Sequence, residues 1–477
     1  MVTPAHSSER TSSSPASDRA RLGTKPHYGL RSEVLSAMET LAQSVSTMAP
    51  SSTPAVTIPL VCALAGNGTW LAYLLATIAV LLVALCIASF ARHSSSPGSL
   101  YVYAAKVLPH WMGAVVAWSL LLAYVATGSS VIGGFYQYAA LVLLRSPATP
   151  ASGVFLTLVV TAISMWVAWR DVKVSARLML WIEALSLLTI LTVVVLVLAR
   201  HGSHWDASQI TVEGMSGSGL RLGLVLALFS FVGFESATTL GAEARNPLRT
   251  IPRAVIQSSL LAGAIFVVCA YTEVLGFHMV GENLGNSQAP MQTLAGVAGA
   301  PILGTLINVG VLVSLFACTL ACVTAAARVL LLMAHNGLAH GTLRNTHQRH
   351  ETPGPAIVVA GIAAGLPVVV LAARGASGLD VYGWMGSLAT YGFIVTYAMV
   401  CVALPRYLRG HGHARPRARI LSVLAFTAML LALVGNLYPV PEGPYGKLPY
   451  IYLVYLAGGL LWFFTVGRNK GATSVER

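Results

Sequence analysis

Long apolar segments separated by short polar loops follow one another along almost the whole chain. Most are about 20 residues or longer, the length that an α-helix needs to cross the hydrocarbon core of a bilayer. They lack the alternation over about ten residues that marks the strands of a membrane barrel. The pattern predicts an all-α polytopic membrane protein with about 12 transmembrane helices, at 34–64, 69–91, 111–144, 152–169, 175–199, 220–242, 253–277, 301–334, 355–373, 379–404, 419–437 and 449–467.

The composition excludes a soluble enzyme. Of the 477 residues, 56% are hydrophobic and 9% are charged, whereas roughly 25% of the residues of a soluble globular protein are charged. So few charges cannot cover a surface that faces water on every side. The six cysteines lie inside apolar segments without the spacing of a metal site, and no nucleophile stands beside a base at a recognisable spacing. We therefore expect no enzymatic activity, no cofactor and no metal.

The net charge of +13 comes from an uneven distribution of Lys and Arg. If the N-terminus is cytoplasmic, about 24 of the 29 Lys and Arg residues lie on the cytoplasmic side. This asymmetry predicts a multi-pass protein of the plasma (inner) membrane with both termini in the cytoplasm. No basic run with interleaved aromatics points to nucleic acid, and the basic residues are expected to lie against anionic membrane lipids. The other side keeps only Arg145, Arg200, Arg221, Arg374 and Lys447.

The first apolar segment is interrupted by small hydroxylated residues and two prolines. The run 44–54 contains Pro50 and Pro54 at the depth of the bilayer centre. Proline removes an amide donor and clashes with the preceding turn, so backbone groups are freed there. In a membrane, freed groups persist only where protein covers them or where they line a cavity. The run predicts a broken helix, and the alternative is a proline kink satisfied by neighbouring Ser and Thr.

The sixth segment, 220–242, also carries residues that do not suit a plain span. Gly233 and Glu235 lie in its middle, where a carboxylate costs several kcal/mol unless it is paired or hydrated. The interruptions in segments one and six are five helices apart. This offset is the one that an inverted repeat of two five-helix halves predicts, with broken helices at corresponding positions around a central ligand.

The region 229–255 carries the run F-S-F-V-G-F-E followed by E-A-R-N-P-L-R-T-I-P-R-A. It resembles the F-x-G-F-[DE] and E-x-x-N-P-x-R-x-I-P-R-A motifs of helix six and the following cytoplasmic loop in the amino acid-polyamine-organocation (APC) transporter superfamily. Two weaker matches lie in register with it. Residues 96–104 are similar to the tyrosine-containing stretch before helix three, and residues 328–338 are similar to the end of helix eight.

The resemblance covers about 34–467 and implies a 5+5 inverted-repeat (LeuT-like) core in which helices 1 and 6 are broken. It also implies secondary transport of amino acids or related amines. The expected organisation is a disordered cytoplasmic tail at 1–30, a transporter domain at 31–467 and a cytoplasmic tail at 468–477. Within the domain we expect one repeat at about 34–199, a second at about 220–404 and peripheral helices at about 419–467.

By this resemblance, the broken helices would hold the two charged groups of a free amino acid. Amides at a half-helix N-terminus suit a carboxylate, and freed carbonyls suit an ammonium. An aromatic gate could include Phe229, Phe231 and Phe234, and Tyr124 and Tyr391 could line the pocket; ordinary packing is the alternative for all five. The carboxylate stretch is Ser46, Thr47, Met48, Ala49, Pro50, Ser51 and Ser52, and the ammonium stretch is Phe229, Ser230, Phe231, Val232, Gly233 and Phe234.

Buried acids are the candidates for coupling. Glu183 in segment five lies at about the point where some proton-coupled relatives place a lysine. Burial disfavours the charged form of a carboxyl group, so Glu183 is expected to take up a proton. Its alternative is a structural carboxyl satisfied by its neighbours. Glu235 is the second coupling candidate, with a structural role in the broken helix as its alternative. Protons are favoured over sodium because the hydroxyl groups of helix eight form no clear pair.

The residues therefore favour a permease that imports an amino acid by alternating access, as a proton symporter. A polyamine or organic amine transporter and an amino acid exchanger are the alternatives within transport. From another class, a membrane sensor that keeps the fold without transporting is the remaining alternative.

Overall fold

The computed structural model describes residues 33–94, 99–170, 172–202, 205–287, 289–347, 350–410, 412, 416–438, 440 and 443–467. The predicted tails at 1–30 and 468–477, and 96–98 at the start of the tyrosine-containing stretch, lie outside the described residues.

The described chain is helical and contains no β-strand, only an isolated bridge between Leu35 and Ala244. Its α-helices are α2 (Ala37–Met48), α3 (Ile58–Ala65), α4 (Thr69–Ala91), α5 (Ser99–Ala105), α6 (His110–Ala139), α7 (Pro150–Arg170), α8 (Val172–His201), α9 (Ala207–Ile210), α10 (Gly217–Phe229), α11 (Pro247–Val280), α12 (Pro290–Val297), α13 (Pro301–His335), α14 (Gly354–Ala373), α15 (Gly378–Gly410), α16 (Pro416–Leu437) and α17 (Leu448–Trp462). Shorter π- and 3-10 turns, including η1 (Thr53–Thr57), η3 (Ala140–Leu144) and η4 (Ser236–Leu240), extend or connect them.

Ten stretches of the described chain are long and apolar enough to cross a membrane. One of them, Ala37–Ala91, contains both the α2–α3 crossing and α4. The shorter apolar helix α10 forms a further crossing together with η4. The all-α polytopic fold with about 12 crossings is thus confirmed. The short helices α5, α9 and α12 were not predicted, because none is long enough to give the signal of a span.

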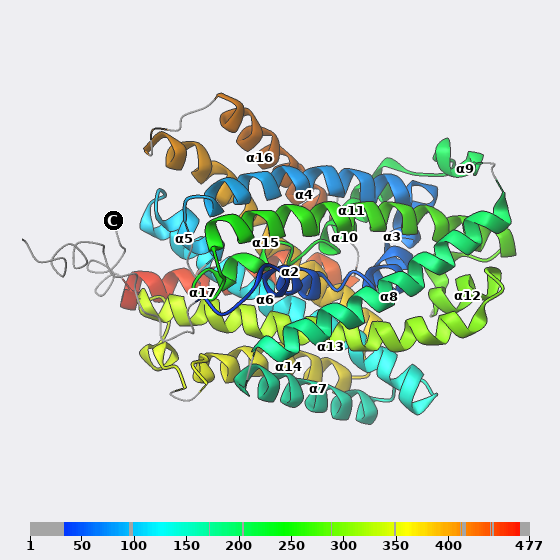
Figure 1. Ribbon diagram of the computed structural model, residues 1–477, viewed down its shortest axis with the longest axis horizontal. Coiled ribbons are helices and arrows are strands. Elements are labelled where there is room, and N and C mark those ends of the chain that lie inside the picture. The colour runs from blue at the N-terminus through cyan, green and yellow to red at the C-terminus, as the bar shows by residue number, and fades with distance from the viewer. Residues whose placement is uncertain are drawn as a thin grey trace, which may run out of the picture.

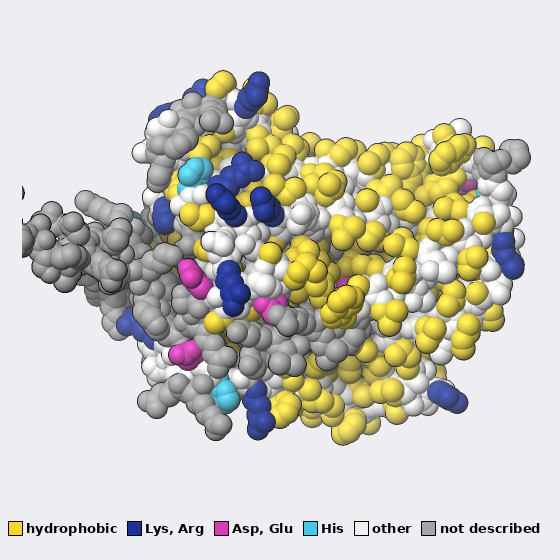
Figure 2. Space-filling model, in the orientation of Figure 1, with side chains coloured by type: hydrophobic (Ala, Val, Ile, Leu, Met, Phe, Trp, Pro, Cys, Tyr) yellow, Lys and Arg dark blue, Asp and Glu magenta, His cyan; other side chains and the backbone are white. Residues whose placement is uncertain are grey.

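The outer surface of the bundle has the properties of a membrane protein. Large apolar side chains such as Phe155, Leu188 and Ile302 are more than 60% exposed, and Figure 2 shows a broad hydrophobic belt across the face in view. Most Lys and Arg side chains visible in this view gather at the left end, where α4 ends and α11 begins (Figures 1 and 2). We call this the basic end of the bundle; α9 and α12 lie at the opposite end.

The centre of the bundle is built on close helix packing. α6 packs against α15 and α13, and α4 packs against α11. Gly392 lets α15 approach α6, because a Cβ atom there would lie 2.5 Å from the Ser119 carbonyl oxygen and 3.0 Å from the Ala123 methyl group. Small residues at helix crossings give the close backbone approach on which packing within membranes depends. α2 and α10 lie near the middle of the bundle, among these helices (Figure 1).

Candidate functional site

The first broken helix is interrupted after Met48. Ala49 ends α2 in the left-handed conformation, with φ 45° and ψ 61°, and its amide donates to the Val45 carbonyl. Pro50 cannot donate an amide, and the amide and hydroxyl groups of Ser52 both donate to the Ala49 carbonyl, at 2.9 and 2.7 Å. The helix then restarts as the π-turn η1, with Pro54 near its first residue, and continues as α3. The interruption lies where the two prolines predicted it.

The second broken helix is interrupted between α10 and η4. The chain turns through Ser230–Glu235, where Gly233 has a φ of +98°. Residues with a side chain rarely adopt this conformation, so glycine supplies it at the lowest cost. η4 then continues the segment as a 3-10 turn, with Glu235 as its N-cap residue. The residues predicted to hold an ammonium form this turn and the last residue of α10.

The two interruptions lie against each other. A Cβ atom on Gly233 would overlap the Thr47 side chain. The Ser236 hydroxyl donates to Thr47 Oγ1 at 2.9 Å, and the Ser44 hydroxyl donates to the Phe234 carbonyl at 2.7 Å. These bonds satisfy backbone and hydroxyl groups that the breaks release. Sequence positions about 190 residues apart therefore form one polar centre inside the bundle. In it, Thr47 and Phe234 of the predicted stretches 46–52 and 229–234 bond to Ser236 and Ser44, which lie just outside those stretches.

Glu183 of α8 contacts the first break directly. Its Oε1 accepts a hydrogen bond of 2.7 Å from the Ser51 amide, and the carboxyl group is buried. The Ser314 hydroxyl of α13 lies beside the same carboxyl group. Because Ser51 precedes the second half of helix one, this amide belongs to a half-helix N-terminus, which attracts negative charge. The group bound at this N-terminus is the protein's own side chain.

Glu235 is held by two tyrosines. Tyr124 of α6 donates to Oε1 at 2.8 Å, and Tyr397 of α15 donates to Oε2 at 2.6 Å. Phe393 packs edge-on against Tyr124, with ring centroids 5.4 Å apart, and Phe234 packs against Tyr397 at 5.4 Å. Both oxygens of this buried carboxyl group are therefore satisfied inside an aromatic cage. The arrangement joins the second break to α6 and α15.

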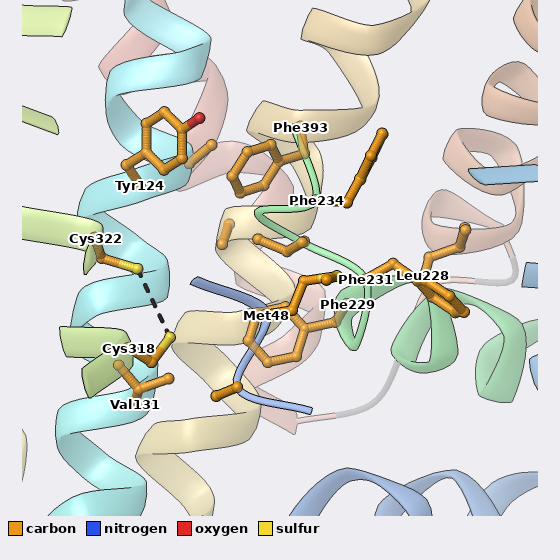
Figure 3. Packing of buried hydrophobic residues seen from close by; sticks show 14 of the residues in the cluster. Met48, Tyr124, Val131, Leu228, Phe229, Phe231, Phe234, Cys318, Cys322 and Phe393 are labelled. Carbon is orange, nitrogen blue, oxygen red and sulfur yellow. Dashed lines mark hydrogen bonds between the residues drawn. The ribbon is translucent and has the colours of Figure 1, made fainter. Parts of the chain in front are cut away.

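Phe229 and Phe231 point in different directions (Figure 3). Phe229 packs edge-on against Tyr382 of α15, with centroids 5.5 Å apart. Phe231 packs against Phe266 of α11, with centroids 5.2 Å apart. Tyr391 lies on the peripheral side, where it donates to the Asn436 carbonyl of α16 and is not brought to the breaks. Of the aromatic candidates, Phe229, Phe234 and Tyr124 contact Tyr382, Tyr397 and Glu235 around the breaks, and their gating or pocket-lining roles stay predictions.

Tyrosines close the site toward the opposite end. Tyr382 and Thr57 share a hydrogen bond of 2.9 Å, and Tyr138 donates to the Ala55 carbonyl at 2.9 Å. Tyr73 shares a bond of 3.0 Å with Ser230 at the second break. All three tyrosines are buried. Hydroxyl groups from α6 and α15 thus hold the second half of helix one in place, and one from α4 contacts the second break.

An ion pair closes the site toward the basic end. Arg328 of α13 binds Glu243 through two bonds, of 2.7 and 2.8 Å, and both side chains are buried. Backbone bonds join the same loop to the start of the first helix, from Leu35 to Glu243 at 2.9 Å and from Arg245 to Leu35 at 2.8 Å. Buried charged pairs of this geometry are costly to break. The basic end of helix one is therefore tied both to the loop after the second break and, through Glu243, to α13.

Several residues of the centre were not singled out by sequence reasoning. Tyr397 and Tyr382 carry no motif, although a tyrosine inside an apolar helix needs a partner for its hydroxyl group. Cys318 of α13 donates to the Thr47 carbonyl at 2.9 Å. Glu273 of α11, by contrast, is a candidate on sequence alone, because it is an acid inside an apolar segment. It is fully buried, and neither of its oxygens has a hydrogen-bond partner among the described residues. A carboxyl group in this position is stable only when it is protonated or neutralised by a cation.

Comparisons with known proteins agree with this geometry. The sequence model of the family described as "Amino acid permease" matches residues 40–439. The chain is 26% identical to cationic amino acid transporter 4 of Mus musculus over 71% of its length, but it spans only 54% of that relative. It is 22% identical to the methylthioribose transporter of Bacillus subtilis, over 85% of this chain and 87% of the relative. It is 23% identical to the branched-chain amino acid permease BcaP of B. subtilis, over 61% and 64%.

The family match covers both broken helices, the loop after the second break and Arg328. It describes a transporter family and not an enzyme family. The fold, the two adjacent helix breaks and the family match point to the same conclusion: this multi-pass membrane protein belongs to the amino acid permease family.

Proposed function

We propose that this chain is a secondary active transporter that imports an amino acid across the cytoplasmic membrane, with a proton carried on Glu183. The observation that carries the proposal is the 2.7 Å bond from the Ser51 amide to the Glu183 carboxyl group. A substrate carboxylate and the Glu183 carboxylate are both attracted to the same half-helix N-terminus. Both cannot be charged there at once without repulsion between them.

This competition supplies a mechanism for coupling. When Glu183 takes up a proton, its attraction to the half-helix N-terminus weakens and the site can accept the carboxylate of an amino acid. When the substrate leaves, Glu183 loses its proton and returns to the Ser51 amide. Release of proton and substrate on the same side gives symport. Opening would break the Tyr382 and Tyr138 contacts on the outer side and, alternately, the Glu243–Arg328 pair on the inner side.

The orientation is part of the proposal. With the basic end toward the cytoplasm, the excess of Lys and Arg obeys the positive-inside rule. The Glu243–Arg328 pair then forms the inner closure and the tyrosines form the outer closure. Both termini lie in the cytoplasm in this orientation.

The hydrogen bonds of Glu235 favour an amino acid over a polyamine as the substrate. A polyamine carrier needs extra acids that face its additional ammonium groups, and Glu235 was the candidate for that role. In the structure both of its oxygens accept hydrogen bonds from tyrosine hydroxyl groups, which supports a structural role in the broken helix. The relatives are named for cationic and branched-chain amino acids and for methylthioribose, and a substrate panel must therefore include all three classes.

The test is uptake into proteoliposomes of labelled amino acids, polyamines and methylthioribose, under an imposed proton or sodium gradient. We expect an amino acid to accumulate with an inward proton gradient alone. Glu183→Gln keeps an oxygen for the Ser51 amide but cannot exchange a proton. It should lose accumulation driven by the pH gradient while retaining exchange of labelled for unlabelled substrate.

Glu282→Gln serves as the matched control, because Glu282 is an exposed acid near the opposite end. It should behave like the parent protein. Uptake by Glu183→Gln that still follows the proton gradient would exclude the coupling role. Uptake that requires substrate preloaded inside the vesicles would replace symport with exchange, and accumulation driven only by sodium would exclude proton coupling.

A further inference from the structure

A hollow at the basic end lies between two helices that pack side by side. It is lined by residues at the end of α4 and in the first turns of α11, and its volume is about 320 Å³. This is within the range of small-ligand sites, about 300–1,000 Å³. Figure 2 shows Lys and Arg side chains grouped at this end of the molecule. The lining residues are Arg92, Leu248, Arg249, Pro252, Arg253 and Ile256.

The hollow concentrates positive charge that no described acid neutralises. The ion pairs among the described residues are Asp206–His278 and Glu243–Arg328, so neither involves a guanidinium group of the hollow. Arg249 and Arg253 lie in the first two turns of α11, where the helix dipole already gives a positive potential. Arginines in this position raise that potential further. An anion in the hollow would relieve the repulsion, and guanidinium groups suit the oxygens of a phosphate.

The surroundings of the hollow are apolar and face the bilayer. Leu248 belongs to its lining and is 43% exposed. Further along the same two helices, toward the membrane centre, Leu85 of α4 and Leu260 and Leu261 of α11 are also exposed. The hydrophobic belt therefore begins directly beside the arginines. A ligand with a phosphate group and acyl chains would contact both surfaces at once, whereas a free phosphate would use only the arginines.

We propose that this hollow binds the phosphate head group of an anionic phospholipid. Its acyl chains would lie along the exposed leucines of α4 and α11. Placement in the cytoplasmic leaflet rests on the orientation given under the proposed function; binding itself does not depend on transport or on its coupling ion.

The site is connected to the inner closure through the first residues of α11. The Thr250 hydroxyl donates to the Arg245 carbonyl at 2.8 Å, and the Arg245 amide donates to Leu35 at the start of helix one. A head group held by Arg249 would therefore stabilise the segment that joins the loop to helix one. We expect the bound lipid to stabilise the closed state of the basic end.

The binding test uses the full chain, purified in a neutral detergent and delipidated. Phosphatidylglycerol and phosphatidylcholine with the same short acyl chains are titrated, and bound lipid is counted by native mass spectrometry. Because one basic residue near an anionic lipid surface contributes about 1 kcal/mol, each Arg→Gln change should weaken phosphatidylglycerol binding about fivefold. The triple variant of Arg92, Arg249 and Arg253 should weaken it roughly a hundredfold.

Arg406→Gln is the matched control, because Arg406 is exposed on α15 at the basic end but does not line the hollow. It should bind phosphatidylglycerol like the parent. The three arginines are themselves exposed, so the single variants should fold, and monodispersity on size exclusion checks this. A further measurement adds inorganic phosphate alone and compares its thermal stabilisation of the protein with that by phosphatidylglycerol.

Three results would overturn the proposal. One is a triple variant that binds phosphatidylglycerol as tightly as the parent does. The second is equal binding of phosphatidylcholine by the parent. The third is stabilisation by inorganic phosphate equal to that by phosphatidylglycerol, which would make the hollow a free-phosphate site. Selective, salt-sensitive binding of phosphatidylglycerol that the single variants weaken would support it.

Discussion

Gly233 offers a quantitative test of how the two helix breaks fit together. In Gly233→Ala, the backbone must keep a φ of +98° with a side chain present, which costs about 1–2 kcal/mol. The new methyl group also overlaps the Thr47 side chain, and overpacking of this kind costs about 1–3 kcal/mol. We therefore expect a loss of about 2–5 kcal/mol in the free energy of unfolding.

A second substitution separates the two contributions. Thr47→Ser removes the γ-methyl group that the new side chain would strike but keeps the hydroxyl group that contacts Ser236 and Gln43. Combined with Gly233→Ala, it should recover only part of the overlap cost of about 1–3 kcal/mol, because the Thr47 Cβ atom stays 2.7 Å from the new side chain. The backbone cost remains as well. Thr47→Val is the matched control, because it keeps methyl groups and loses the hydroxyl group, so it should not rescue.

The assay is unfolding of the purified protein in detergent, followed by tryptophan fluorescence, together with uptake into proteoliposomes. Gly233→Ala should lower the unfolding midpoint and the uptake rate, and the larger Gly233→Leu should abolish uptake while the protein still inserts into membranes. The reasoning is refuted if Gly233→Ala is as stable as the parent. It is also refuted if Thr47→Ser and Thr47→Val change the effect of Gly233→Ala equally.

Three further perturbations test the contacts around the site. Tyr397→Phe removes one of the two hydroxyl groups that bind Glu235, and the free energy of unfolding should fall by about 1–3 kcal/mol. An unchanged denaturation curve would contradict this and would show that water replaces the hydroxyl group. Arg328→Met leaves Glu243 buried without its partner and should lower the free energy of unfolding by about 3–5 kcal/mol. Adding Glu243→Gln should recover most of this loss, and equal instability of the single and double variants would contradict the expectation. Burial opposes ionisation of Asp206, but hydrogen bonds from neighbouring side chains outweigh it and lower its pKa to about 2 from 3.8. Asp206→Asn should therefore destabilise the protein at neutral pH, and the stability difference from the parent should shrink as the pH falls through about 4 toward 2. A stability difference that is independent of pH would show that the charge of Asp206 does not stabilise the fold.

The sequence predicted the positions of the helix breaks because their causes are local. Pro50 and Pro54 interrupt a helix wherever they occur, and Gly233 and Glu235 stand out in any apolar segment because glycine loosens the backbone and a carboxylate needs a partner. The length and hydrophobicity of each segment, which are also local properties, predicted the number of crossings. The motif in 229–255 then identified the family, which the match over residues 40–439 shows.

The partners of the buried polar groups were decided only by the tertiary structure. Glu183 and Glu235 are both acids inside apolar helices, and their local sequences do not distinguish them. In the fold, one carboxyl group binds a half-helix N-terminus and the other is held by two tyrosines. Tyr391 and Tyr397 are separated by less than two turns of one helix, yet only Tyr397 reaches the second break.

The physical reason is the range over which each signal acts. Hydrophobicity and proline geometry act within a helix, so the sequence by itself determined the spans, the breaks and the family. Hydrogen bonds inside a membrane protein join helices far apart in the chain, and a shift of one residue turns a side chain by about 100° around the helix axis. Packing of the helices alone therefore decided which acid contacts Ser51, which tyrosine reaches Glu235 and which arginines share the hollow at the basic end.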